Sequence, residues 1–396
     1  MHTNKPSAPT YGGAWRPSPQ QELLLRAALW QGDAARAAWK TWYAQTQLAP
    51  IDQGSYRLLP LVYLNLLAAG NAHPARAELK KIYHHTWYHS QIRLRRGAAV
   101  LRALHQQHIP TLLLKACALI PLYYHDAGAR PFSDLDILVP SSHLRLALEI
   151  LNREGWTPES RPLAEMNEHY VARWYAHTLA NAQGAQLDLH HRSLYLETRA
   201  EGDAEFWAGS IPLDFFGVPT QALNPADQLL HICAHALAWN RISPMRWVAD
   251  AFVVLRAEKV DWARFLQTTR DHDLGLAMSH LLSYLRDEFH APIPQAVLDA
   301  LAQLQSSSFR KLEYRLMALP PAERSATSKL IYHVECYRQL ARVYKNKNWL
   351  LRFPAFLRDT WDLASLREVP KYILHYTTTR VAARFKASPR RLNEDS

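Results

Sequence analysis

Residues 111–140, T-L-L-L-K-A-C-A-L-I-P-L-Y-Y-H-D-A-G-A-R-P-F-S-D-L-D-I-L-V-P, decide the fold of this chain. An apolar run ends at Lys115, a helix-compatible segment follows to about Asp126, and a Gly-Ala-Arg-Pro turn leads into a second apolar run. Asp134 and Asp136 stand at the start of that second run. Because aspartate is a poor strand former and costly to bury, two of them in a strand need a chemical reason.

Strand geometry turns this pair into a candidate metal site. Alternation along a strand places Asp134 and Asp136 on one face, with their Cα atoms roughly 6–7 Å apart. Like charges at that distance are unfavourable unless a cation or a proton neutralises them. A later strand-like run, Q-L-D-L-H at 186–190, places Asp188 and His190 on one face as well. If the two strands are neighbours, three carboxylates converge into an oxygen-rich cage suited to Mg²⁺ or Mn²⁺. The alternative is an acidic pair on a solvent-facing strand.

The bulk composition indicates a globular protein of two or three domains. The chain has 396 residues, 48% of them hydrophobic and 20% charged, which is enough to bury more than one core. Its longest apolar stretch, 58–69, is far shorter than the ~20 residues that cross a bilayer. The polar, Pro-rich residues 1–19 lack the apolar region of a signal peptide. Three widely separated cysteines suit free thiols in a reducing compartment. We therefore expect a cytoplasmic protein with no membrane partner.

Basic residues give the chain a net charge of +11. Such a charge suits a polyanionic partner, either RNA or nucleotide phosphates, but it is equally typical of an ordinary basic protein. The longest helical pattern, 74–107, carries a stripe of Lys, Arg and His residues. That stripe is either a solvated helix face or a wall that faces phosphate.

The order of the predicted elements divides the chain into three regions. Residues 1–100 form an N-terminal helical region, 101–218 the central core, and 219–396 a C-terminal helical region. Within the core, 170–192 is typical of a β-hairpin that turns at Gln183-Gly184. In the C-terminal region, His231 and His235 are four residues apart on a helix. A helix face that packs beside the sheet, with His235 near a ligand, explains them better than a zinc site, because no Glu follows His231.

The central stretch resembles a known family, the bacterial "uncharacterised nucleotidyltransferase" family of the DNA-polymerase-β-like nucleotidyltransferase superfamily. The resemblance covers about 101–289. It rests on L-L-L-K-A at 112–116, Tyr123, Gly128, Arg130, D-L-D-I-L-V at 134–139, L-D-L-H at 187–190, L-N-P-A-D-Q-L-L-H-I-C-A-H at 223–235 and R-W-V-A-D at 246–250.

The resemblance implies an α+β fold in which a small mixed β-sheet is flanked by N-terminal and C-terminal helices. It also implies a nucleoside triphosphate bound with two metal ions, Mg²⁺ or Mn²⁺, and in-line attack on the α-phosphate with pyrophosphate leaving. Asp134 and Asp136 would be metal ligands and Asp188 the third carboxylate, next to the acceptor. The predicted nucleotide-binding residues are Lys115, Ala116, Arg130, Ser133, His190 and His235.

One position departs from the family pattern. The superfamily places Gly-Ser or Gly-Gly where the first helix begins, so that bare amides hold the triphosphate, whereas this chain has Ala116-Cys117. An alanine amide still donates to phosphate at a helix N-terminus. Its Cβ, however, restricts close backbone approach and a positive φ.

These observations predict a metal-dependent nucleotidyltransferase that moves an NMP from an NTP to a hydroxyl or phosphate acceptor. The acceptor class stays open among a small molecule, a protein and RNA. Two alternatives also stay open: a catalytically degenerate scaffold that binds nucleotide or RNA, and a toxin-like transferase that modifies tRNA.

Overall fold

The computed structural model describes residues 15–46, 48, 51–70, 74–166, 171, 174–195, 202–237, 245–319, 326–343, 349–361, 363 and 365–374. The chain divides into two compact units, one formed by 1–197 and 201–318 and the other by 198–200 and 319–396. In the second unit, α16 (Ala326–Val343) packs against α17 (Trp349–Thr360). There the Tyr337 ring lies 4.8 Å from the ring of Phe356. The sheet and the candidate site belong to the first unit.

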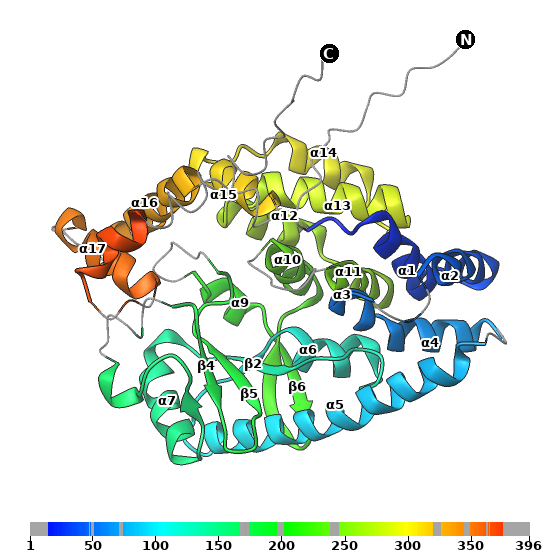
Figure 1. Cartoon of the computed structure of the whole chain (residues 1–396), viewed down its shortest axis with the longest axis horizontal. Coiled ribbons are helices and arrows are strands. Elements are labelled where there is room, and N and C mark those ends of the chain that lie inside the picture. Colours follow the sequence, from blue (N-terminus) through cyan, green and yellow to red (C-terminus); the bar gives the residue numbers. More distant parts are fainter. Residues whose placement is uncertain are drawn as a thin grey trace, which may run out of the picture. The chain divides into compact units, whose positions relative to one another are not determined.

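A seven-stranded mixed sheet forms the centre of the first unit (Figure 1). Its spatial order is β3-β4-β5-β2-β1-β7-β6. The β1/β7 and β2/β5 pairs are parallel, and the other pairs are antiparallel. The strands are β1 (Leu112–Leu113), β2 (Asp134–Leu138), β3 (Thr157–Pro158), β4 (Ala176–Ala180), β5 (Gln186–His190), β6 (Ile211–Phe215) and β7 (Val218–Ala222).

Alternation along β2 separates an apolar face from a polar one. Leu135, Ile137 and Val139 share one apolar cluster with residues of α5 (Arg76–His105) and α7 (Leu144–Arg153). Figure 1 shows α5 running beneath the sheet. Because a strand's successive side chains point to opposite faces, Asp134 and Asp136 project from the other side. One face of β2 thus anchors the strand in the core and leaves the opposite face for chemistry.

Helices cover the polar face as well. α10 (Pro225–Ala236) begins at Asn224, whose side chain accepts hydrogen bonds from the amides of Ala226 and Asp227, and Pro225 occupies the first turn. Leu138 of β2 joins the apolar cluster that contains α10. The other helices of the first unit are α1 (Pro19–Leu29), α2 (Gly32–Thr46), α3 (Gln53–Tyr56), α4 (Leu59–Ala68), α6 (Lys115–Leu119), α9 (Ala204–Ala208), α11 (Arg246–Ala257), α12 (Trp262–Asp271), α13 (Gly275–Phe289), α14 (Gln295–Gln303) and α15 (Ser308–Ala318).

The predicted fold class is confirmed: the protein is α+β, with a mixed sheet between N-terminal and C-terminal helices. The predicted hairpin is also present, since β4 and β5 pair antiparallel around Gly184 at φ 70°. The β6–β7 hairpin was missed. Its turn residues Phe216 and Gly217 both have positive φ, which is a hairpin signal, but Pro212 and Pro219 obscure the strand pattern.

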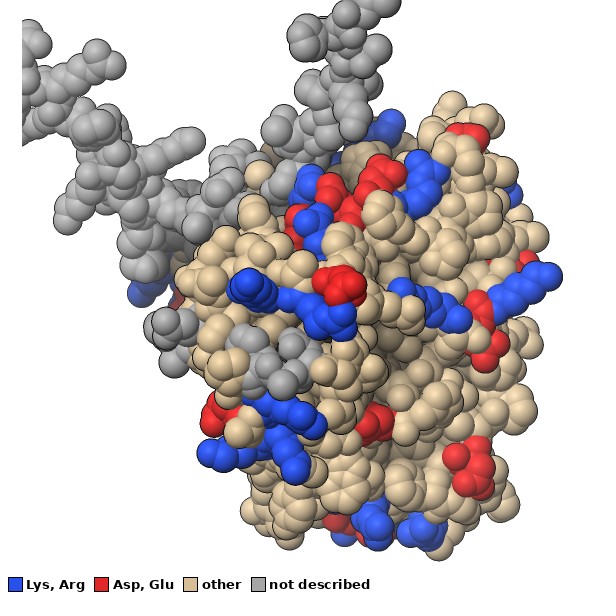
Figure 2. All heavy atoms as spheres, turned by 90° about the vertical axis from the view of Figure 1, so that its right-hand side faces the viewer, with Lys and Arg blue, Asp and Glu red and all other residues tan. Residues whose placement is uncertain are grey.

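Charge is mixed on the surface that Figure 2 shows, where Lys and Arg side chains lie among Asp and Glu. Over the described residues of this face, acidic side chains interrupt the basic ones, which is unlike the continuous basic stripe of a nucleic-acid-binding surface. No helix within the described ranges combines the length and the hydropathy that a bilayer crossing needs.

Candidate functional site

The parallel β2–β5 pair brings the predicted acidic residues together. Asp136 lies directly opposite Asp188 in the register, and Leu138 lies opposite His190. One ligand atom each from Asp136, Asp188 and His190 lie within 4.8 Å of one another. Asp134 is two residues earlier on the same face of β2 and is not one of these three. The sequence prediction of converging strand carboxylates is therefore confirmed for Asp136 and Asp188.

Lys115 and His190 both contact one oxygen of Asp136. Lys115 Nζ lies 2.6 Å from Asp136 Oδ1, and His190 Nε2 lies 3.1 Å from the same atom. Burial opposes ionisation of Asp136, which is 2% exposed, but the charge of Lys115 and the His190 contact outweigh it and hold the pKa of this carboxyl well below its usual range. In the described part of the chain, Asp136 Oδ2 has no hydrogen-bond partner. Asp136 is thus an ionised carboxylate with one oxygen available.

Asp188 has the opposite electrostatic character. Burial first, and the charge of Asp136 second, raise the pKa of the Asp188 carboxyl above its ordinary value. Its Oδ1 accepts a hydrogen bond of 2.7 Å from Thr178 on the neighbouring strand β4. Two carboxylates face one another here and one cation, Lys115, lies against them, so a further cation would lower the energy of the site.

The donor set suits a hard divalent cation. Carboxylate oxygens are the ligands that Mg²⁺ and Mn²⁺ take in proteins, and Asp136 and Asp188 present them from rigid strands. The Nε2 contact with Asp136 leaves Nδ1 as the other ring nitrogen of His190, and Nδ1 is buried without a hydrogen-bond partner. These residues therefore fit the metal that the sequence predicts.

A pocket of about 330 Å³, open solvent included, adjoins the cluster. It is lined by Lys115 and His190 from the sheet side and by His231 and His235 from α10. Burial, followed by the nearby charge of Lys115, lowers the pKa of His231 to about 3 and the pKa of His235 well below its usual value. Both imidazoles are therefore neutral at physiological pH. The predicted placement of this helix face beside the sheet is observed, and a nucleotide contact by His235 stays a prediction.

Arg130 is engaged elsewhere. Its Nε and Nη2 donate to the two oxygens of Asp250 on α11, at 2.8 and 2.7 Å, and the Tyr124 hydroxyl donates to Asp250 at 2.7 Å. Arg130 is 4% exposed. Arg130 and the last residue of R-W-V-A-D at 246–250 thus form a buried, bidentate ion pair. This pair gives both of these motif residues a structural role. A phosphate contact by Arg130 stays a prediction.

Two further predicted positions sit beside the cluster. Ser133 donates a hydrogen bond of 3.0 Å to Asp134 Oδ1. Ala116 is 1% exposed and packs within the apolar cluster of the sheet, α5 and α7. The positive φ of this segment falls on Lys115, at 46°, and Ala116 has an ordinary negative φ. The Cβ of Ala116 therefore imposes no backbone strain, although its amide contact with phosphate stays a prediction.

Three arginines at the start of β2 were not among the predicted site residues. Arg246 Nη1 donates to the Pro131 carbonyl, and Arg93 of α5 lies over the Phe132 ring, 5.9 Å from its centroid. Arg57, at the end of α3, lies within electrostatic range of Asp134, which opposes the lowering of the Arg57 pKa by burial. None of these three arginines has a carboxylate within 4.0 Å among the described residues. Arg93 belongs to the basic stripe of the long helix, but no local signal marks Arg57.

The comparisons with known proteins agree with this geometry. A family model described as uncharacterised nucleotidyltransferase matches residues 55–290, which is more than half of the chain. The chain belongs to this family. The match begins before the predicted resemblance at 101 and takes in the end of α3 and all of α4 and α5, so both Arg57 and Arg93 lie inside it. No curated protein is similar enough to the chain to count as a match.

Proposed function

We propose that this protein is a metal-dependent nucleotidyltransferase that moves an NMP from an NTP to an acceptor hydroxyl or phosphate. The observation that carries the proposal is the pairing of Asp136 with Asp188 across two parallel strands, with ligand atoms within 4.8 Å. Two carboxylates at this distance repel each other unless a cation or a proton neutralises them, and a divalent cation does so while both stay ionised. Family membership supports the same chemistry.

Asp134, Asp136 and Asp188 would hold Mg²⁺ or Mn²⁺. Such ions offset the charge on the transferring phosphoryl group and lower the pKa of an attacking hydroxyl. His190 keeps the Asp136 carboxylate in one orientation, because its Nε2 contacts Oδ1 while the strand pairing fixes both backbones. Thr178 does the same for Asp188.

The arginines at the start of β2 supply a site for the leaving group. Arg57 stands near Asp134, Arg93 near Phe132 and Arg246 near Pro131. The pocket beside His190, by contrast, lies where β2 and β5 end. Pyrophosphate is a polyanion, so its charge is matched at the arginine end. Because attacking and leaving oxygens lie roughly in line, the acceptor approaches from the His190 end.

The proposed reaction is an in-line displacement at the α-phosphorus. The acceptor oxygen forms a bond to the α-phosphorus while the bond to the pyrophosphate oxygen breaks, and the acceptor proton passes to the Asp188 carboxylate. Asp188 suits that role because Lys115 and His190 already hold Asp136, whereas Asp188 accepts a hydrogen bond from the neutral Thr178 hydroxyl. Pyrophosphate leaves toward the arginine end, where Arg57, Arg93 and Arg246 would offset its charge.

Incubation of the full chain with each α-labelled NTP and Mg²⁺ or Mn²⁺ tests this function. We expect pyrophosphate release and label transfer to an acceptor from a cell extract, both dependent on the metal. A folded protein that binds no NTP with either metal would contradict the proposal.

A second candidate, a nucleotide-binding scaffold without turnover, is favoured by one contact. Lys115 Nζ already neutralises Asp136 at 2.6 Å, as a resident cation would. The scaffold predicts that wild type and Asp136→Asn bind NTP equally and that neither releases pyrophosphate. Metal-dependent release by the wild type eliminates it.

A further inference from the structure

A second, larger pocket adjoins the catalytic one. Its space is about 620 Å³ with open solvent included, against about 330 Å³ for the catalytic pocket measured in the same way. The two pockets share three lining residues, Leu194 and Tyr195 after β5 and Ala234 on α10. Leu194 follows His190 by four residues, so the larger pocket continues the catalytic one beyond the strand ends. We call it the outer pocket.

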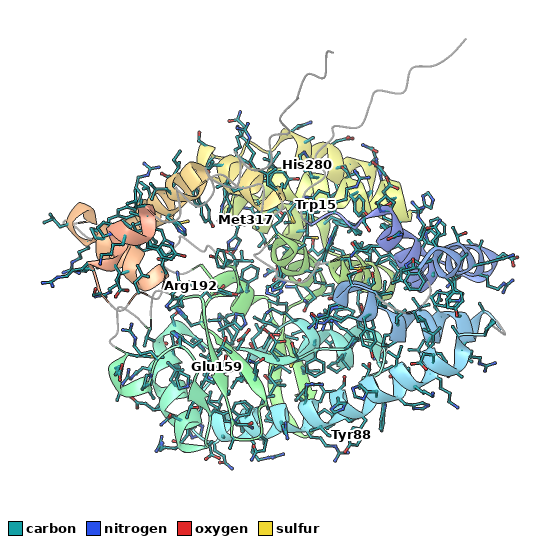
Figure 3. The ribbon with its side chains drawn as sticks, in the orientation of Figure 1. Trp15, Tyr88, Glu159, Arg192, His280 and Met317 are labelled. Carbon is teal, nitrogen blue, oxygen red and sulfur yellow. The ribbon has the colours of Figure 1, made fainter. Side chains whose placement is uncertain are left out.

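The lining of the outer pocket is mainly apolar. Its larger apolar and aromatic side chains come from the segment after β5 and from α10, α13 and α15, and they include Tyr195, Leu237, Leu276, Tyr314 and Met317. Met317 is labelled in Figure 3, in the layer of helices above the sheet. Apolar lining of this kind recognises a ligand by the surface that it buries.

The charged residues of the lining are matched within the protein. Arg310 Nη1 lies 2.6 Å from Glu313 Oε2, and this pair is largely buried. Asp273 accepts hydrogen bonds from the Ser307 amide at 3.1 and 3.2 Å. With one arginine against two carboxylates, the lining has a net negative charge. A polyanionic acceptor is therefore disfavoured here, in contrast to the arginine end of the site.

From this geometry we infer that the outer pocket binds the acceptor, and that the acceptor is an uncharged hydroxyl compound with an aromatic or aliphatic body. The inference rests on the proposed function, which places the acceptor at the His190 end. Its hydroxyl reaches the Asp136–Asp188 cluster through the catalytic pocket, while its apolar body lies against Leu276 and Met317. This assignment makes an RNA end a poor acceptor.

The test uses 2-phenylethanol as a neutral aromatic hydroxyl probe and methyl NMR of the full chain with labelled methionines. The chain has five methionines, and Met317→Leu assigns the signal at the pocket. We expect millimolar 2-phenylethanol to shift the Met317 signal. The signal of Met166, which packs in the apolar cluster of the sheet, α5 and α7, should stay unchanged. Leu276→Trp fills the pocket and abolishes the shift. Ala302→Trp, on an exposed position of α14, keeps it.

A non-hydrolysable NTP analogue with Mn²⁺ tests whether the outer pocket holds the acceptor or the nucleoside. We expect it to bind wild type and Leu276→Trp within about twofold of one another, and to leave bound 2-phenylethanol in place. Displacement of the probe by the analogue would assign the pocket to the nucleoside and overturn the inference. A Met317 shift with a short RNA oligonucleotide and none with 2-phenylethanol would overturn it too. Failure of the analogue to bind at all contradicts the proposed function, whereas the probe result concerns the pocket alone.

Discussion

Two buried ion pairs of the first unit, Arg130–Asp250 and Lys115–Asp136, use their carboxylates in different ways. Arg130 and Tyr124 occupy both oxygens of Asp250. Lys115 and His190 share one oxygen of Asp136 and leave the other without a partner in the described chain, opposite Asp188. The closed pair holds the turn before β2 against α11, whereas an open pair beside a second carboxylate is a site for a ligand. The two pairs are similarly buried. They differ in whether both carboxylate oxygens have a hydrogen-bond partner.

The largest expected effect is on catalysis at the open pair. Asp136→Asn keeps the shape of the side chain and removes the charge that would hold the metal. We expect NMP transfer to fall by at least about 10³-fold, which corresponds to roughly 4 kcal/mol of transition-state stabilisation. The measurement is pyrophosphate release at saturating NTP. Asp214→Asn, at an exposed position of β6, is the matched control and should retain wild-type activity. A loss of less than tenfold in Asp136→Asn would remove Asp136 from the metal site.

The closed pair should dominate stability. Asp250→Asn leaves the Arg130 guanidinium buried without its charge partner, so the unfolding free energy should fall by about 3 kcal/mol or more. Urea denaturation of wild type and variant measures the loss. In Asp136→Asn the Lys115 charge still has Asp188 and Asp134 nearby, so the loss should be smaller. Equal losses in both variants would contradict the distinction between a closed and an open pair.

The arginine end of the site should control nucleotide affinity. Arg57→Ala and Arg93→Ala each remove a charge-assisted contact with the leaving group, for which we expect about a tenfold weaker binding of NTP, or ~1.4 kcal/mol. Calorimetric titration with a non-hydrolysable analogue and Mn²⁺ gives the dissociation constants. Arg102, an exposed residue in the last turn of α5, supplies the control as Arg102→Ala. Unchanged affinity in both test variants would place the triphosphate elsewhere.

The smallest expected effect concerns Asp188, where function and stability oppose each other. Because its pKa is raised by burial and by Asp136, the folded chain holds this proton to a higher pH than the unfolded chain does. Stability is therefore lost as the pH rises through the window between the two pKa values, and the ionised carboxylate is unfavourable at neutral pH. Without metal, Asp188→Asn should melt at a higher temperature than wild type at pH 7, and this gain should disappear at acidic pH. A lower melting temperature at pH 7 would show that Asp188 is not strained.

Much of this site was readable from the sequence because strand periodicity is simple. Two aspartates in an apolar run, and a third in a later strand, are sufficient to predict that the carboxylates share a face. Which strands are neighbours is a matter of topology, and here the resemblance to a family supplied it. Because Asp136 pairs with Asp188, His190, two positions later on the same face of β5, also lies at the site.

Other partners could not be read from the sequence because they depend on tertiary packing. Arg130 stands in the motif, yet Asp250, 120 residues later, takes its guanidinium. Arg57 follows Ser55, whose hydroxyl contacts the Met245 sulfur, and Met245 precedes Arg246. A contact between residues 190 positions apart cannot be read from the sequence. The outer pocket likewise assembles from separate helices whose apolar residues are indistinguishable from core residues in the sequence.

Binding of Mn²⁺ tests the central claim most directly, because it needs neither an acceptor nor turnover. Electron paramagnetic resonance follows free Mn²⁺ as it is titrated into the full chain with a non-hydrolysable NTP analogue. We predict saturable binding by wild type and by Asp214→Asn, and a loss of at least about tenfold in affinity for Asp136→Asn and for Asp188→Asn. Wild-type Mn²⁺ affinity in both of these variants would contradict the assignment of the Asp136–Asp188 cluster as the metal site.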